Sequence, residues 1–208
     1  MSLLSFDRSY RRRGYVTIAG VDEAGRGPWA GPVVAAAVVL PEKTFIAGLR
    51  DSKKLTEKKR EEIYVQIGKF ALAVGVGIAD QSVIDSVNIL QATYLAMKEA
   101  LKRIGMLPGL VLVDGYKIPD LEYFQVGIIG GDDKSASIAA ASVVAKVTRD
   151  RLMVEWSRKY PQYGFERHKG YGTKIHRDAL FKFGPCELHR KSFEPVRLSG
   201  EFLRNHGN

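Results

Sequence analysis

Cysteine and long apolar runs are what this 208-residue sequence has least of. The one cysteine, Cys186, cannot form a disulfide within the chain, which is typical of a protein from a reducing compartment. The longest apolar run, residues 33–40, is far too short to cross a bilayer, and the first residues contain no apolar stretch of signal-peptide length. We therefore expect a cytoplasmic protein that does not enter a membrane.

Two common ligand sites are also missing, and acidic residues are in deficit. One cysteine and scattered histidines do not give the ligand spacing of a zinc site, and no Walker-type phosphate loop is present. The 32 Lys and Arg outnumber 23 Asp and Glu, and residues 146–195 hold 12 basic against 6 acidic residues. This excess favours a polyanionic partner such as nucleic acid, or an anionic membrane surface. A positive surface that only keeps the protein soluble is the alternative.

The order of the apolar segments predicts an α/β domain with a mixed five-stranded sheet flanked by helices. Apolar, β-branched stretches predict strands, and apolar residues three and four positions apart predict helices. The expected strands are residues 15–22, 32–40, 70–79, 110–113 and 124–129, and the expected helices are residues 56–67, 82–104, 130–160 and 173–183. The first three strands should be antiparallel, whereas the helix before the fourth allows a parallel arrangement there.

The two ends of the sequence are less regular. Residues 1–14 carry a basic cluster that is either an arm for nucleic acid or a frayed polar terminus. We expect residues 1–160 to form the α/β core. Residues 161–208 should add a basic loop, the short helix and a mostly irregular tail, as a small C-terminal helical extension packed on that core in one structural unit.

The longest expected helix has an apolar stripe that should be buried. Its members are Ile138, Ala141, Ala145, Leu152 and Trp156. Arg149 falls within this stripe, so it should have an acidic or backbone partner.

Four acidic positions lie at the ends of the expected core elements. Asp22 and Glu23 end the first strand, and Asp114 ends the fourth. Asp132 or Asp133 lies where the longest helix begins. Ligands collect at strand ends in such sheets, so these carboxylates can meet in one cleft. Taken singly, each acid is better explained as part of a turn or as a helix cap.

Taken together, the acids point to a metal site. Three or four carboxylates in one cleft raise one another's pKa unless cations neutralise them. Hard oxygen ligands in a basic surround indicate Mg²⁺ or Mn²⁺ with a phosphate-bearing substrate. Two such ions held ~4 Å apart activate water and stabilise the leaving oxygen in phosphodiester cleavage.

Six ordered motifs resemble those of bacterial ribonuclease HII, from about residue 15 to Pro195. They are Val21-Asp-Glu-Ala-Gly-Arg-Gly-Pro28, Asp51-Ser-Lys53, Val113-Asp-Gly115, Gly131-Asp-Asp-Lys-Ser135, Ala140-Ala-Ser-Val-Val-Ala-Lys146 and His168-Lys-Gly-Tyr171. The resemblance implies a ribonuclease H-like fold. It also implies an endoribonuclease that cuts the RNA strand of RNA–DNA hybrids and nicks duplex DNA 5′ to embedded ribonucleotides, leaving 3′-hydroxyl and 5′-phosphate ends.

The resemblance further implies roles for the acids. Asp22, Glu23, Asp114 and Asp132 match the family's catalytic, metal-binding carboxylates, with two Mg²⁺ or Mn²⁺ ions expected when substrate is present. Asp132 is preferred to Asp133 because it directly follows a glycine, as in the family pattern. Asp133 is then left to cap the helix.

The remaining matches concern the substrate. Gly25, Arg26 and Gly27 match the segment whose backbone reads the ribose 2′-hydroxyl, the group that separates RNA from DNA. Tyr171 matches the tyrosine that packs at the ribonucleotide–DNA junction, although an ordinary half-buried aromatic is the alternative. Candidates for phosphate contacts are Lys53, Lys146 and Lys169. Lys146 is equally well explained as a surface pair with Asp150.

Two alternatives remain beside this assignment. Ribonuclease HIII resembles the same core but carries an extra N-terminal domain and a glutamate as its fourth acid. Here about 14 residues precede the first strand and the fourth acid is aspartate, which favours ribonuclease HII. The second alternative is a catalytically silent nucleic-acid-binding module. Such a module would not need all four acids, so the full set favours an enzyme.

The expected partners are RNA–DNA hybrid and ribonucleotide-containing duplex DNA. Nothing after Pro195 matches a known sliding-clamp motif. We therefore expect a monomer with no protein partner and no membrane contact.

Overall fold

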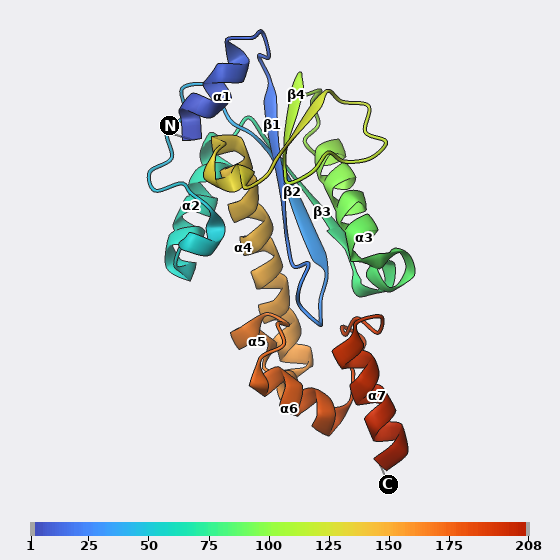
Figure 1. Cartoon of the computed structure of the whole chain (residues 1–208). Coiled ribbons are helices and arrows are strands. Elements are labelled where there is room, and N and C mark those ends of the chain that lie inside the picture. Colours follow the sequence, from blue (N-terminus) through green and yellow to red (C-terminus); the bar gives the residue numbers. More distant parts are fainter. Residues whose placement is uncertain (1–2, 207–208) are drawn as a thin grey trace.

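The computed structural model describes residues 3–206 and contains the expected mixed sheet. Its strand order is β3-β2-β1-β4-β5 (Figure 1). The strands are β1 (Ile18–Ala24), β2 (Val33–Val39), β3 (Ala73–Ala79), β4 (Leu110–Asp114) and β5 (Gln125–Ile128). The first three are antiparallel neighbours, whereas β4 runs parallel to both β1 and β5. The predicted fold class and strand directions are confirmed.

Helices cover both faces of this sheet. Helix α3 (Gln81–Arg103) packs on one face, and α4 (Ala136–Lys159) packs on the other together with α1 (Leu3–Arg11) and α2 (Glu57–Phe70) (Figure 1). All seven residues of β2 are therefore buried, which is why that strand is a continuous apolar run in the sequence.

Two glycines of β3 let helix α3 lie close to the sheet. A Cβ built on Gly75 would be 2.1 Å from the carbonyl oxygen of Ala100, and one on Gly77 would be 1.9 Å from that of Ala96. Any side chain at either position would push the helix away.

The chain after α4 forms a helical extension beyond one end of the sheet (Figure 1). It contains a 3₁₀ turn, η3 (Pro161–Tyr163), and helices α5 (Phe165–His168), α6 (Lys174–Phe183) and α7 (Glu194–His206). Phe165 is fully buried in a cluster with Ala30 and Met153, so the extension packs on α4 and on the β1–β2 connection. Within residues 3–206, no helix combines the length and the apolar character needed to cross a membrane.

Both ends of the chain are more regular than expected. Residues 3–11 form α1 rather than a frayed terminus, because the buried carboxylate of Asp7 accepts hydrogen bonds from the backbone N–H and the hydroxyl of Ser137 at the start of α4. The tail expected to be irregular contains α7, which packs against α6.

Two helix boundaries also differ from the predictions. Helix α4 begins at Ala136, because the hydroxyl of Ser135 accepts the N–H of Ile138, whereas residues 131–133 form a separate 3₁₀ turn, η2. Helix α2 continues past Gly68 to Phe70.

The long helices also differ internally from the expected pattern. Helix α3 is interrupted at Asn88, which has a φ of 69°. In α4 the residues Leu152 and Trp156 are half-buried, while Met153, which was not predicted, is fully buried.

Candidate active site

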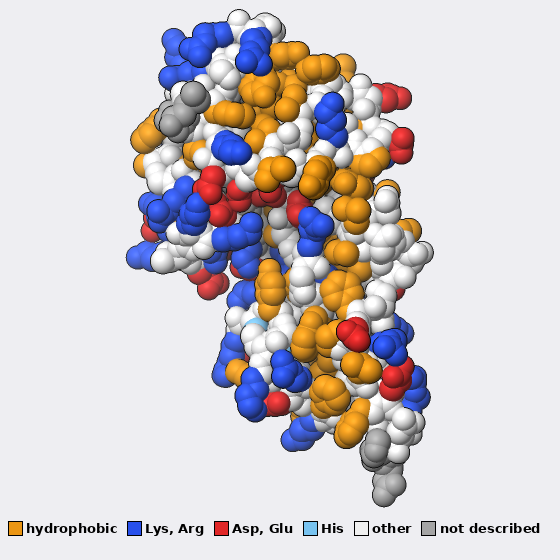
Figure 2. Space-filling view, in the orientation of Figure 1, with side chains coloured by type: hydrophobic (Ala, Val, Ile, Leu, Met, Phe, Trp, Pro, Cys, Tyr) orange, Lys and Arg blue, Asp and Glu red, His pale blue; other side chains and the backbone are white. Residues whose placement is uncertain are grey.

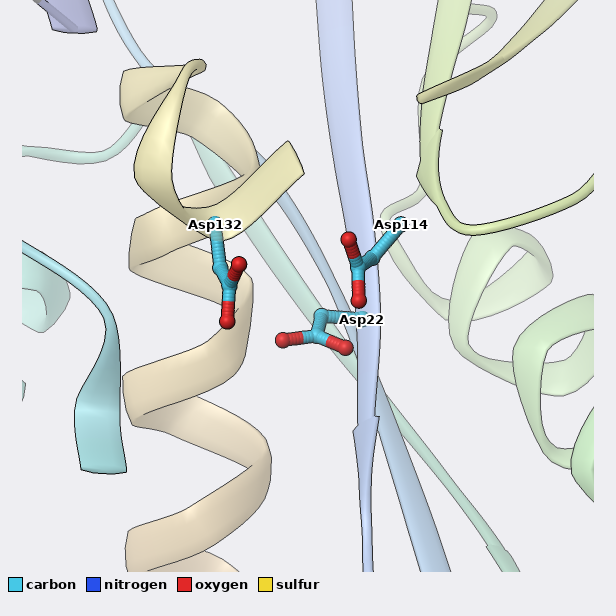
Figure 3. A group of neighbouring side chains, drawn as sticks. All are labelled: Asp22, Asp114 and Asp132. Carbon is cyan, nitrogen blue, oxygen red and sulfur yellow. The ribbon is translucent and has the colours of Figure 1, made fainter. Parts of the chain in front are cut away.

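Three aspartates from separate elements meet at one edge of the sheet. Asp22 lies in β1, Asp114 ends β4 and Asp132 lies in η2, and one carboxylate oxygen from each falls within 4.8 Å of the others (Figure 3). Strands β1 and β4 are parallel neighbours, so their carboxyl ends reach the same edge. The N–H of Gly131 donates to Asp114 Oδ1 at 2.6 Å, which ties η2 to the end of β4.

Asp22 and Asp132 are buried and Asp114 is half-buried, so their negative charges repel one another with little solvent to screen them. Burial raises the pKa of Asp22 well above its ordinary value, and the neighbouring charges of Glu23 and Asp114 raise it further. Burial also raises the pKa of Asp132, with Asp114 adding to the effect. A cation would relieve this repulsion. Because the donors are all carboxylate oxygens, the group fits a hard divalent ion such as Mg²⁺ or Mn²⁺.

Glu23 lies beside this group on the other face of the sheet. Successive side chains of a strand point to opposite faces, so Glu23 points toward α3 while Asp22 points toward α4. Its Oε1 accepts a hydrogen bond of 3.3 Å from Nη1 of Arg26. Burial raises the pKa of Glu23, although the charge of Arg26 acts against the rise. Together with Asp114, Glu23 lines a cavity of about 330 Å³ that extends toward α3.

The structure separates Asp132 from Asp133. Asp132 is buried within the acidic group, whereas the side chain of Asp133 is 49% exposed and forms an ion pair of 2.5 Å with Lys54. Asp133 does not cap α4, so that expectation was wrong. A further acid, Asp51, was missed: it is buried, and one of its carboxylate oxygens lies within 4.8 Å of those of Asp132 and Asp133. Its signal in the sequence was the Asp51-Ser52-Lys53 motif.

The predicted lysines lie in different settings. Lys53 Nζ is 3.7 Å from Asp132 Oδ2. Partial burial acts to lower the pKa of Lys53, but the surrounding acids outweigh it and raise that pKa. Lys146 forms the expected pair with Asp150 at 2.7 Å, and its ammonium also lies 5.8 Å from the ring centre of Tyr171. Lys169 Nζ donates to the carbonyl oxygen of Glu166.

The predicted substrate-reading residues lie next to one another. Gly25 follows β1 with a φ of +98°, a conformation that favours glycine. A Cβ on Gly27 would be 3.9 Å from Cε1 of Tyr171. Tyr171 is 43% exposed, so its ring is available to a ligand. In Figure 2 Lys and Arg side chains lie to the left of and below the central acidic patch, a charge pattern suited to a polyanion.

The comparisons with known proteins agree with this geometry. A sequence profile of ribonuclease HII matches residues 19–196, most of the chain. This chain belongs to the ribonuclease HII family. It is 60% identical over 180 residues to ribonuclease HII of Caldicellulosiruptor bescii, covering 86% of this chain and 87% of that one. It is 55% identical over 197 residues to ribonuclease HII of Bacillus subtilis, covering 95% and 77%.

A solved structure shows a similar fold. The ribonuclease H2 from Pyrococcus horikoshii aligns with a TM-score of 0.76 at 27% identity, over 90% of this chain and 99% of that one. As a member of the ribonuclease HII family, this chain is a type 2 ribonuclease H, a metal-dependent hydrolase of phosphodiester bonds. The resemblance drawn from the six motifs is thereby confirmed, and ribonuclease HII is supported over the ribonuclease HIII alternative.

Sequence reasoning missed one polar support of the ribonuclease HII acids. The hydroxyl of Ser142 in α4 lies 2.8 Å from that of Ser52, and both are buried. Ser142 also acts to lower the pKa of Asp22, against the larger effect of burial. Ser142 lies in the Ala140–Lys146 motif that resembles ribonuclease HII, but that motif alone did not indicate its contact with Ser52.

Proposed function

We propose that this enzyme cuts the RNA strand of RNA–DNA hybrids and also nicks duplex DNA on the 5′ side of single embedded ribonucleotides. The products would carry 3′-hydroxyl and 5′-phosphate ends. The observation that carries the proposal is the grouping of Asp22, Asp114 and Asp132 at one edge of the sheet. The segment that contains Gly25 and Gly27 directly follows β1, the strand that carries Asp22.

We propose that Asp22, Asp114 and Asp132 supply the metal ligands, with Glu23 joining them from the adjacent position in β1. Mg²⁺ or Mn²⁺ would be held there, two ions when substrate is bound. The bound ions would activate water and stabilise the leaving oxygen. Lys53, 3.7 Å from Asp132, would offset the negative charge of the group and approach a substrate phosphate.

The substrate would be read beside the acids. We assign the backbone of Gly25, Arg26 and Gly27 to the ribose 2′-hydroxyl, because glycines allow a sugar to approach the main chain closely. Tyr171, adjacent to Gly27, would pack against the sugar of the following nucleotide. Lys146 and Lys169, which both precede the tyrosine in the sequence, would contact phosphates, in keeping with the basic character of residues 146–195.

The test is cleavage of a labelled DNA duplex that carries one ribonucleotide, beside an all-DNA duplex and a longer RNA–DNA hybrid. With Mg²⁺ or Mn²⁺, we expect one nick 5′ to the ribonucleotide, cleavage of the hybrid, an intact all-DNA control and no cutting in EDTA. Cleavage of the hybrid alone would refute the single-ribonucleotide activity. Binding without any cutting would favour a silent module.

The role of the acids is tested by Asp114→Asn, which keeps the size of the side chain and removes its charge. Cleavage should fall by at least about 100-fold because a metal ligand is weakened, while affinity for the duplex is retained. Lys102→Ala, on the exposed side of α3, is the matched surface control and should leave cleavage unchanged. Full activity in the Asp114 variant would show that this carboxylate is not a metal ligand.

A further inference from the structure

Two arginine side chains lie completely buried behind the segment proposed to read the ribose. Arg149 of α4 and Arg190, which precedes α7, are both 0% exposed. Arginine is almost never fully buried without a partner. Among residues 3–206 neither arginine takes part in an ion pair with a carboxylate. Their partners are backbone carbonyl oxygens, most of them in residues 25–32, called here the 25–32 loop.

Arg190 binds four carbonyls of this loop. Its Nη2 donates to the carbonyl oxygens of Gly25 at 2.5 Å and Pro32 at 3.1 Å. Its Nη1 donates to that of Arg26 at 2.9 Å, and its Nε to that of Gly31 at 2.9 Å. One guanidinium therefore ties together both ends of the loop.

Arg149 binds the same loop and a second segment. Its Nε and Nη2 donate to the carbonyl oxygens of Pro32 at 2.9 Å and Ala30 at 3.1 Å. Its Nη1 donates to that of Lys169 at 2.9 Å, two residues before Tyr171. Arg149 thus fixes the loop relative to the turn that carries the tyrosine.

These bonds determine which way the peptide groups of the loop face. In a trans peptide the C=O and the N–H of the next residue point in opposite directions. Because the carbonyls of Gly25 and Arg26 point to Arg190, the N–H groups of Arg26 and Gly27 point away from it. Both of these residues are exposed. The loop therefore presents main-chain donors outward from a buried cationic support.

The two buried arginines also explain why residue 25 is glycine, and they place positive charge behind the 25–32 loop. A Cβ on Gly25 would lie 2.0 Å from Nε of Arg149, so no larger residue fits. Burial lowers the pKa of Arg149 to about 10. Burial, and then the charge of Arg149, lower the pKa of Arg190 to about 9. Both groups stay cationic at neutral pH, and two positive charges without carboxylate partners attract an anionic nucleic-acid backbone.

We propose that Arg149 and Arg190 are positioning residues for specificity: they hold the 25–32 loop in the conformation that separates a ribonucleotide from a deoxyribonucleotide. The inference rests on the role proposed for Gly25, Arg26 and Gly27. The arginines do not touch the reacting atoms, and act through the peptide groups that they orient.

The first experiment measures selectivity in Arg190→Lys and Arg149→Lys. Lysine keeps the positive charge, but one ammonium cannot reproduce the planar fork that reaches several carbonyls. Binding of the one-ribonucleotide duplex and of the all-DNA duplex is measured with Ca²⁺ in place of Mg²⁺, so that affinity is read without cutting. We expect the preference for the ribonucleotide to fall by about tenfold, with all-DNA affinity within about twofold of wild type.

A matched control is Arg11→Lys, which removes a guanidinium that also binds backbone carbonyls, those of Val16 and Leu40, at another part of the sheet. It should leave the preference unchanged. Equal losses for both duplexes in the Arg149 and Arg190 variants, or an unchanged preference in both, would overturn the inference.

The second experiment reads the loop without substrate. Hydrogen exchange of residues 25–32 in the free protein should be at least about tenfold faster in both lysine variants, with exchange in the middle of α3 unchanged. Unchanged exchange in the loop would overturn the inference. A wild-type protein that binds both duplexes equally would instead refute the proposed role of the loop, while the exchange result still decides whether the arginines order it.

Discussion

Two buried histidines in the extension should make the protein lose stability as the pH falls. His176 Nδ1 is 3.0 Å from the carbonyl oxygen of Tyr171, so this nitrogen carries the proton. His176 Nε2 faces His189 Nε2 at 3.0 Å, and His189 Nδ1 accepts the N–H of Cys186 at 2.9 Å. The pair therefore shares one proton between its two Nε2 atoms. A second proton there would set two N–H donors against each other.

The magnitude follows from the shifts in pKa. Burial lowers the pKa of His176 from 6.5 to about 4, and burial together with the charge of His176 lowers that of His189 to about 3. The unfolded chain then binds more protons than the folded protein below about pH 6.5, so the free energy of unfolding decreases as the pH falls. For His176 alone the loss is roughly 2 kcal/mol between about pH 7 and pH 5, and about 3 kcal/mol once the pH is below 4.

The assay is urea unfolding followed by circular dichroism over that pH range, in wild type and in His176→Asn. The asparagine amide can still donate to the carbonyl of Tyr171 but does not titrate. We expect the variant to be less stable at about pH 7 and to lose roughly 2 kcal/mol less on acidification than wild type. Parallel pH profiles for the two proteins would refute the reasoning, because the histidine would then contribute no linked proton.

Two other predictions concern packing and the acids. A Cβ on Gly20 would lie 2.1 Å from the backbone of Ser137, so Gly20→Ala should push α4 off β1 and lower the free energy of unfolding by about 1–3 kcal/mol, measured by urea unfolding. Asp133→Ala removes an exposed ion pair with Lys54 and should cost under about 1 kcal/mol with cleavage retained, whereas Asp132→Ala should abolish cleavage. An equal loss of cleavage in these two variants would show that the two aspartates share the role.

Much of the fold was predictable because its core follows simple periodic patterns. The apolar run of residues 33–40 is a strand buried on both faces, and the helical spacing of Thr93, Met97 and Ala100 matches their burial under the sheet. The helix expected from residue 56 begins where the hydroxyl of Thr56 accepts the N–H of Lys59 and caps α2. These features depend on local sequence, so the sequence was sufficient to find them.

What the sequence did not reveal depends on contacts between distant residues. Helix α1 is short and rich in arginine, and it is held by the contact of Asp7 with Ser137, 130 positions away. The break at Asn88 was hidden by apolar spacing that continues across it, although the Asn88 side chain accepts the N–H groups of Leu90 and Gln91 as a helix cap does.

The candidate site shows the same division between local and distant information. The acids were found because they end strands or follow glycines. The partner of Arg149 was predicted only as acidic or backbone, and the structure shows three backbone carbonyls, while Arg190 carried no signal. Carbonyl groups are present at every residue, so no side-chain pattern identifies which of them a buried arginine will bind.

The contacts of Arg190 with residues 25–32 also bear on the order in which a new chain can mature. Synthesis proceeds from the N-terminus, and the three grouped aspartates are all made by residue 132. The loop beside Asp22 obtains its main support from a residue about 160 positions later. During translation the acidic residues thus exist well before the arginine that fixes the loop. On the role proposed for the loop, selectivity for the ribose can therefore be acquired only after Arg190 has been made.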